Sequence, residues 1–289
     1  METRQNFEAY LLNRGLKLDT ASQHRKHVSY FLVWLAQESL ALVQITHAEI
    51  LDFVDAVRAE GRSVNHTNRI LRSLGYYFAF LAKEQTVSHN PGLGIILKGS
   101  MRTVPSNLLD RKELDALYAT YEITDDRTHR NKVILGMVTC QALTRRELET
   151  LRPENIRLRE GKLQVPATGK TCGRLLALER HQILDLQEYL LMVHPRLQQG
   201  SQRLFCGRQN LESLKNSLLH LGHALRRINP KVRHISQLRQ SAITEWLKEK
   251  DLRTVQYMAG HRYVSSTERY QTTNLEELRE ALAKHHPLK

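Results

Sequence analysis

Three residues near the C-terminal end of the chain could together carry out phosphoryl transfer: Arg239, His261 and Tyr270. A phenol can attack phosphorus as a nucleophile, an imidazole can move a proton or hold an oxygen, and a guanidinium can carry charge on the phosphate oxygens. Each residue also has an ordinary structural explanation. A Gly-His pair often ends a helix, and a tyrosine near a terminus often packs at a surface. Taken singly, the structural explanation is favoured for each of them.

The order and spacing of these residues carry more information than the residues alone. The segment resembles the C-terminal signature of the tyrosine recombinase family, which includes phage integrases and Xer-type recombinases. That signature reads H-x-L-R, a helix, L-G-H and then T-x-x-Y, and the chain supplies Leu238-Arg239, Gly260-His261 and Thr267-x-x-Tyr270 in this order. The resemblance implies that Tyr270 forms a covalent bond with a DNA 3′ phosphate. It also implies that Arg239 binds the scissile phosphate and that His261 assists the transition state.

One position of the family pattern departs from expectation in a chemically important way. The family's first catalytic arginine lies in G-L-R-x-x-E-L, and the matching segment is 142–148. Its arginine position holds Thr144, whose hydroxyl cannot replace a bidentate guanidinium on a phosphate. Arg145 is the candidate substitute, with Arg146 beside it, but adjacent helix positions are rotated by about 100° and point elsewhere. A surface charge or a DNA-backbone contact is the more ordinary explanation for both arginines.

Two further positions of the pattern are also altered. The first residue of H-x-L-R falls on Ser236, which cannot act as an acid or base at neutral pH, and His234 is a weaker alternative. The resemblance also implies a lysine in a small sheet. Alignment on Arg174 places Gly169 at that position, with Lys170 one place over. Lys170 is therefore the candidate for protonating the leaving 5′ oxygen, and an exposed turn residue is the equal alternative.

The elements that must position these residues are mainly helices. Residues 1–97 show helical apolar periodicity, and we predict a bundle of four or five short helices. This part resembles the SAM-like, core-binding N-terminal domain of the same recombinases, which implies a helical clamp on DNA. Arg62, Arg69 and Arg72 lie on one side of the fourth helix and are candidates for phosphate contacts. The alternative is an ordinary solvated helix face.

We predict a linker at 98–107 and a second domain over 108–289, which the resemblance identifies as catalytic. Gly and Pro punctuate the chain before and within the linker. Asp110, followed by Glu113, is a capping box that begins the next helix. Short strands are expected at 156–158, 162–165 and 174–178, with helices from about 180 onward. The fold class is thus mainly α with a small antiparallel β-sheet. The resemblance also implies that a helix over 275–284 docks on a neighbouring protomer, and a plain amphipathic terminal helix is the alternative.

Composition favours a polyanionic partner. The chain has 43 Lys and Arg against 30 Asp and Glu, a formal net charge of +13. The excess is concentrated in the second domain, because residues 1–100 carry a net charge of +2 and the remainder +11. Lysines and arginines that contact phosphates release condensed counterions, so double-stranded DNA is the expected partner.

Other features limit the location and the cofactors. No apolar run is long enough to cross a membrane, and the first residues lack the apolar core of a signal peptide. Three widely separated cysteines indicate reduced thiols and a cytoplasmic protein rather than a disulfide framework or a zinc site. No metal or nucleotide cofactor is expected.

The resulting hypothesis is a site-specific DNA recombinase or integrase that cuts and rejoins DNA through a 3′-phosphotyrosine. We expect it to act as a homo-tetramer on DNA, with a mixed complex containing a related recombinase as the alternative assembly. A DNA-binding accessory protein of the same fold, with weak or no catalysis, is the alternative function, and Thr144 and Ser236 motivate it. A topoisomerase with the same tyrosine chemistry has less support from the two-domain layout.

Overall fold

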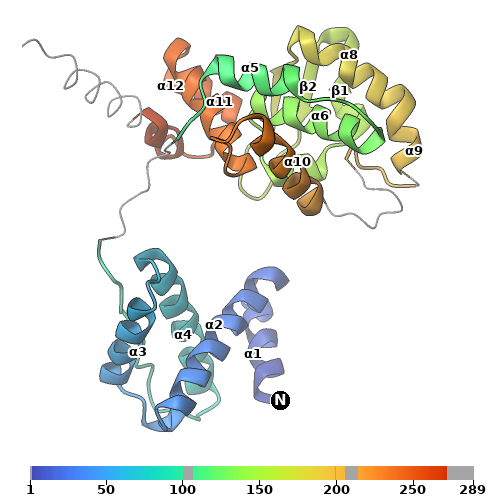
Figure 1. Ribbon diagram of the computed structural model, residues 1–289. Helices are drawn as coiled ribbons and strands as arrows, with labels where there is room; N and C mark the ends of the chain where they lie inside the picture. Colours follow the sequence, from blue (N-terminus) through green and yellow to red (C-terminus); the bar gives the residue numbers. More distant parts are fainter. Residues whose placement is uncertain (1, 100–106, 199, 206–213, 272–289) are drawn as a thin grey trace, which may run out of the picture. The chain divides into compact units, whose positions relative to one another are not determined.

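The computed structural model describes residues 2–99, 107–198, 200–205 and 214–271 (Figure 1). Its contacts divide the chain into two compact units, Met1–Arg102 and Thr103–Lys289. Both are dominated by helices, and the second also contains a small antiparallel sheet, which confirms the predicted fold class.

The N-terminal unit is a helical bundle with an aromatic core (Figure 1). Phe31 lies near its centre, with the rings of Phe53 and Phe78 packed edge-on against it at 5.0 and 5.9 Å. All three side chains are buried, so the helices are held together mainly by apolar contact. Its elements are α1 (Glu2–Asn13), α2 (Leu18–Gln37), the 3-10 turn η1 (Leu42–Gln44), α3 (His47–Ala59) and α4 (Val64–Lys83).

A polar cluster is buried between α2 and α4. His24 Nδ1 and His27 Nδ1 each lie 2.8 Å from Ser73 Oγ, which donates to the backbone oxygen of Arg69. Burial, together with His66 and other nearby charges, lowers the pKa of His27 to about 4. The cluster is therefore stable with a neutral His27 and is weakened when that imidazole is protonated.

The first helix of the C-terminal unit begins where the sequence predicts. Asp110 caps α5 in a capping box with Glu113, and Thr46 caps α3 in the same way in the other unit. A second group of helices then follows the sheet. The helices of this unit are α5 (Arg111–Thr120), α6 (Asp126–Thr139), α7 (Arg145–Thr150), α8 (Arg180–Glu188), the π-helical η4 (Tyr189–Val193), α9 (His194–Gln198), α10 (Leu214–Ile228), α11 (Ile235–Glu249) and α12 (Leu252–Ala259), with 3-10 turns η2 (Pro153–Asn155) and η3 (Leu158–Glu160).

The sheet has three antiparallel strands in the order β1 (Ile156–Arg157), β2 (Lys162–Val165) and β3 (Arg174–Ala177). Lys162 pairs with Ala177 and Val165 with Arg174, so residues 166–173 form the connection between β2 and β3. Side chains alternate between buried and exposed along β3, and Arg174 takes a buried position. A charged side chain that points into the core is the unusual feature of this sheet.

The core of the C-terminal unit lies around α6 and α11. Leu238, Ala242 and Ile243 place one face of α11 in this core, and α6 packs against it. The helix that was predicted over 275–284 lies outside the described residues. Among the residues that the structure does describe, no helix is both long and apolar enough to cross a membrane.

Candidate active site

Arg239 projects from the first turns of α11 into a buried position. Its Nη2 donates to the backbone oxygen of Ala259 at 2.8 Å and lies 3.2 Å from His261 Nε2. Its Nη1 is buried without a hydrogen-bond partner among the described residues. Burial lowers the pKa of Arg239 to about 10, so the group remains cationic at neutral pH. A buried cationic N–H without a partner is costly, and an anionic oxygen is the group that would satisfy it.

The end of α12 places His261 beside this guanidinium. Gly260 ends the helix in the left-handed conformation, with φ of 68°, and the backbone N–H of His261 bonds to the Gln256 oxygen at 3.0 Å. A glycine reaches this conformation without the steric cost that a Cβ imposes. The structural explanation of the Gly-His pair therefore holds for Gly260, and the same turn directs His261 toward α11.

Tyr270 lies on a helical segment, residues 265–271, that packs on His261. The two rings stack with centroids 6.0 Å apart and an interplanar angle of 12°. Thr267, one turn earlier on the same face, is buried, and its Oγ1 lies 2.9 Å from His261 Nδ1. The T-x-x-Y spacing thus puts the hydroxyl that holds the imidazole and the phenol that stacks on it on one helix face.

The contacts of His261 define its protonation state. An arginine can only donate, so Nε2 of His261 accepts from Arg239, and the ring proton lies on Nδ1 and is directed at Thr267. Burial, together with the charges of Arg239, Arg269 and Arg174, lowers the pKa of His261 to about 4. The imidazole is therefore neutral at physiological pH in the DNA-free protein.

A buried ion pair lies next to this site. Arg174 pairs with Glu147, and both side chains are 0% exposed. Arg174 Nε also donates to the backbone oxygen of Met258 at 2.7 Å, and its guanidinium lies directly under Gly260. The pair therefore joins α7, β3 and the end of α12.

Thr144 is used as a helix cap. It is the N-cap residue of α7, and Glu147 completes a capping box with it. The hydroxyl and backbone N–H of Thr144 both donate to Glu147 Oε2, at 2.8 and 2.7 Å. This hydroxyl is thus committed to the helix start and to the carboxylate that binds Arg174.

Lys170 and Arg145 occupy different surroundings. Lys170 lies in an exposed turn that is attached to the site, because Thr171 forms a β-bridge with His261 and the Cys172 N–H donates to the Gly260 oxygen at 3.0 Å. Arg145 is exposed and pairs with Glu149 at 2.8 Å, and none of its described contacts joins it to Tyr270 or its neighbours. The structure thus brings Arg239, His261 and Tyr270 together, holds the turn of Lys170 beside them and leaves Arg145 apart.

Ser236, which holds the first position of H-x-L-R, and its alternative His234 lie at the start of α11. His234 is its N-cap residue, and Nδ1 accepts from the backbone N–H of Gln237 at 3.0 Å. Ser236 is exposed, with Oγ 3.0 Å from the same nitrogen. Both side chains therefore have a local helix-capping role in this structure.

Four residues of the site had no functional role in the sequence predictions: Glu147, Arg174, Thr267 and Arg269. A charged residue in the inward register of a short strand is a signal that could have marked Arg174. Thr267 stood inside a quoted motif, but only the fold shows that it contacts His261. Among the described residues, no group of three His, Cys, Asp or Glu side chains comes together as metal ligands.

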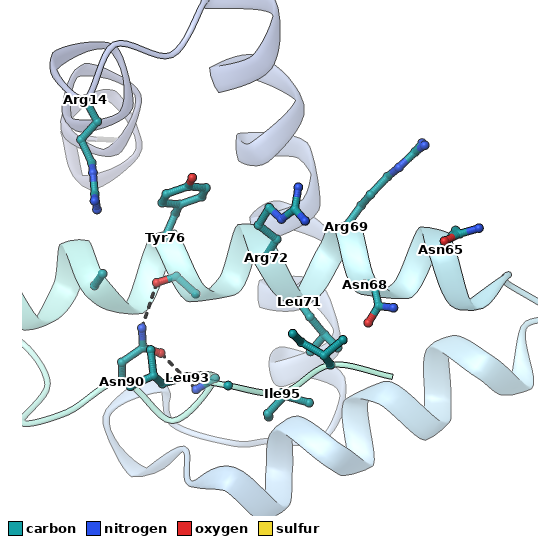
Figure 2. A pocket seen from close by; sticks show the side chains of 15 residues that line it. Arg14, Asn65, Asn68, Arg69, Leu71, Arg72, Tyr76, Asn90, Leu93 and Ile95 are labelled. Carbon is teal, nitrogen blue, oxygen red and sulfur yellow. Dashed lines mark hydrogen bonds between the residues drawn. The ribbon is translucent and has the colours of Figure 1, made fainter. Parts of the chain in front are cut away.

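The N-terminal unit has a separate basic hollow, of about 670 Å³, between Arg14 (just after α1), α4 and residues 90–96. Figure 2 shows Arg69 and Arg72 on α4 and the side chain of Arg14 extending toward Tyr76. The Arg14 guanidinium lies 5.6 Å from the Tyr76 ring centroid. Within the described part of the chain these three arginines form no ion pair, whereas Arg62 pairs with Glu60.

Comparisons with known proteins give a consistent result. A model of the "Phage integrase family" matches residues 107–277, and one of the "Phage integrase, N-terminal SAM-like domain" matches residues 5–85. The chain is 25% identical to the tyrosine recombinase XerD of Pseudomonas putida over 288 residues, which cover 98% of this chain and 96% of the relative. It is also 25% identical to the tyrosine recombinase XerC of Oceanobacillus iheyensis, over 93% of this chain and 90% of the relative.

Solved structures show the same fold at lower identity. The XerH site-specific recombinase, in a post-cleavage complex with its difH substrate, matches with a TM-score of 0.75 and 18% identity over 93% of this chain and 81% of that chain. A lambda integrase dimer bound to a core site matches with a TM-score of 0.66 and 15% identity, over 93% of this chain and 94% of that chain.

Proposed function

This chain belongs to the phage integrase family of tyrosine recombinases, and from this premise we propose that it is a site-specific DNA recombinase. The observation that carries the proposal is the contact set of Tyr270, His261 and Arg239. Arg239 comes from α11, His261 from the turn after α12 and Tyr270 from the helical segment 265–271, and their side chains meet through stacking and hydrogen bonds. A nucleophile, a neutral imidazole and a cation with an unpartnered N–H are the groups that metal-independent phosphoryl transfer uses.

In the proposed reaction the phenol oxygen of Tyr270 attacks the scissile phosphorus. The new P–O bond to Tyr270 forms as the bond to the 5′ oxygen breaks, which leaves a 3′-phosphotyrosine and a free 5′ hydroxyl. Arg239 Nη1 binds a non-bridging oxygen, and the phenol proton passes to water. His261 donates to the phosphate once its Nε2 is released from Arg239 and protonated. Lys170, on the turn that is bonded to the His261 segment, supplies the proton of the leaving oxygen. The 5′ hydroxyl of a partner strand then reverses the step.

We propose that the chain is divided into a DNA core-binding domain (1–97), a linker (98–107) and a catalytic domain (108–289). Arg14, Arg69 and Arg72 around the basic hollow then contact DNA phosphates, and their charge is available because none of them is paired within the described residues. We place the protein with its DNA, in the cytoplasm.

Solved structures of similar recombinases motivate a proposal about oligomeric assembly on DNA. They include a lambda integrase tetramer bound to a Holliday junction as well as the dimer complex. We propose that four copies of this chain hold two duplexes, with a mixed complex containing a related recombinase as the alternative.

One observation favours a second candidate function. Thr144 replaces the family's first arginine and is fully used as a helix cap. Loss of one charge-stabilising donor commonly costs about 10²- to 10³-fold in rate. An accessory DNA-binding protein, with weak or no catalysis, is therefore the alternative.

A plasmid assay tests these functions against each other. A supercoiled plasmid carries two copies of a candidate site drawn from DNA that flanks the gene, and it is incubated with the protein. The proposed function predicts recombinant circles, which should be absent with Tyr270→Phe. Relaxation without exchange would indicate a topoisomerase, and a mobility shift without any product would favour the accessory protein.

A further inference from the structure

Arg269 is a second cation of the site, and it contacts Tyr270 directly. Its Nη2 donates to the Tyr270 phenol oxygen at 3.1 Å, and its guanidinium carbon lies 5.1 Å from the centre of the same ring. Arg269 is exposed, whereas Tyr270 is only 3% exposed. The exposed side chain of Arg269 thus reaches the oxygen of a buried phenol.

Two other arginines of the C-terminal unit are paired with carboxylates. The charge of Arg174 is compensated by Glu147, and Arg145 pairs with Glu149 away from the phenol. Arg269 has no carboxylate partner in the part of the chain that the structure describes. Its charge is consequently available to the phenol and to an anion beside it. This charge also reaches the centre of the site, because Arg269 is one of the groups that lower the pKa of His261.

We propose that Arg269 is a catalytic residue that supplies the second guanidinium of this site, in place of the arginine missing at Thr144. In the ground state it hydrogen-bonds the phenol oxygen. As the P–O bond to Tyr270 forms, the phenol proton passes to water, and the leaving 5′ oxygen takes up a proton from Lys170. Arg269 stabilises the negative charge on the phenol oxygen first and then the charge on the adjoining phosphate oxygens. This inference rests on the proposed recombinase function.

The first test compares the rate of covalent adduct formation on a nicked suicide substrate at saturating DNA. Arg269→Gln removes the charge and keeps a polar side chain of similar length, and Arg269→Lys keeps the charge without the fork. Arg253→Gln is the matched control, since Arg253 is an exposed arginine on α12 whose Nη1 bonds Gln256 at 3.2 Å. We expect Arg269→Gln to slow the adduct by about 10²- to 10³-fold. We expect a smaller decrease in the adduct rate for Arg269→Lys, and a wild-type rate for Arg253→Gln.

Saturating DNA and a mobility-shift measurement separate catalysis from binding. The proposal is overturned if Arg269→Gln forms the adduct within about threefold of the wild-type rate, a change too small for a charge-stabilising donor. If wild-type protein binds DNA but forms no adduct, the proposed function fails and this assignment fails with it. That outcome is distinct from an active wild type whose Arg269→Gln variant is equally active.

A second test asks whether Arg269 stands in for the missing arginine. Thr144→Arg restores the family pattern, at the cost of the α7 N-cap. In the Thr144→Arg background we expect Arg269→Gln to slow adduct formation by only about tenfold or less, because the two guanidinium groups stabilise the same negative charge. If Arg269→Gln slowed adduct formation equally in both backgrounds, Arg269 would not be replacing the missing arginine. Circular dichroism of each variant establishes that it is folded.

Discussion

Removal of the Glu147 charge should destabilise the C-terminal unit strongly. Glu147 and Arg174 are both 0% exposed, so Glu147→Gln leaves a guanidinium buried without its counter-charge. Breaking a buried pair in this way costs roughly 3–5 kcal/mol. Arg174 keeps its bonds to the backbone oxygens of Met258 and Cys172, which places the expected cost at about 3 kcal/mol. Gln can still accept from Thr144, so loss of the helix cap does not account for the effect.

The same pair predicts a pH dependence. Burial favours the protonated carboxyl, but the hydrogen bond and charge of Arg174 outweigh burial, and the pKa of Glu147 is lowered. A lowered carboxyl pKa contributes stability that is fully present above the unfolded value and is lost as the pH falls through the folded value. The difference between wild type and Glu147→Gln should therefore be largest above about pH 4.5 and shrink in acid.

Urea unfolding followed by tryptophan fluorescence measures this cost. Trp246 is buried in the core of the C-terminal unit, and Trp34→Phe removes the tryptophan signal of the N-terminal unit. Glu149→Gln is the matched control, since it removes the half-buried partner of the exposed Arg145 and should cost less than about 1 kcal/mol. An equal cost for the two variants, or a cost below about 1 kcal/mol for Glu147→Gln, would refute the reasoning.

Three further predictions concern single residues. In an NMR titration of the DNA-free protein, His261 should remain neutral until the pH approaches 4, and a transition near 6.5 would contradict its burial beside Arg239. The unfolding temperature should fall as the pH drops from 6.5 toward 4, because unfolded His27 takes up a proton that the folded imidazole resists, and His27→Gln should flatten this dependence. Gly260→Ala should cost about 1–3 kcal/mol in a thermal melt, since its Cβ would sit at positive φ against the Arg174 guanidinium. An unchanged melting temperature would show that this turn tolerates a side chain.

Local rules predicted the elements of this fold well. The capping box at Asp110 marked a helix start that the structure confirms. The three short strands were placed to within one residue at either end. These features depend on residues that are close together in the chain, so they can be recognised in the sequence alone.

The supporting part of the site could not be predicted in the same way. Glu147 and Arg174 are 27 residues apart, and only packing of α7 against the sheet brings them together. The side chain of Arg269 contacts its neighbour Tyr270, but chain proximity does not show that its guanidinium turns back onto the phenol oxygen. Arg145 was considered because of its position beside Thr144, whereas the start of α7 directs it toward Glu149.

The most direct test of the account is to identify the residue that becomes linked to DNA. Protein trapped on a nicked suicide substrate is digested, and the nucleotide-linked peptide is sequenced by mass spectrometry. We predict a 3′-phosphotyrosine at Tyr270, lost in Tyr270→Phe and retained in Tyr263→Phe, which changes an exposed tyrosine seven residues earlier. A link to any other residue, or no link from wild-type protein that binds the same DNA, would contradict the assignment of Tyr270 as the nucleophile.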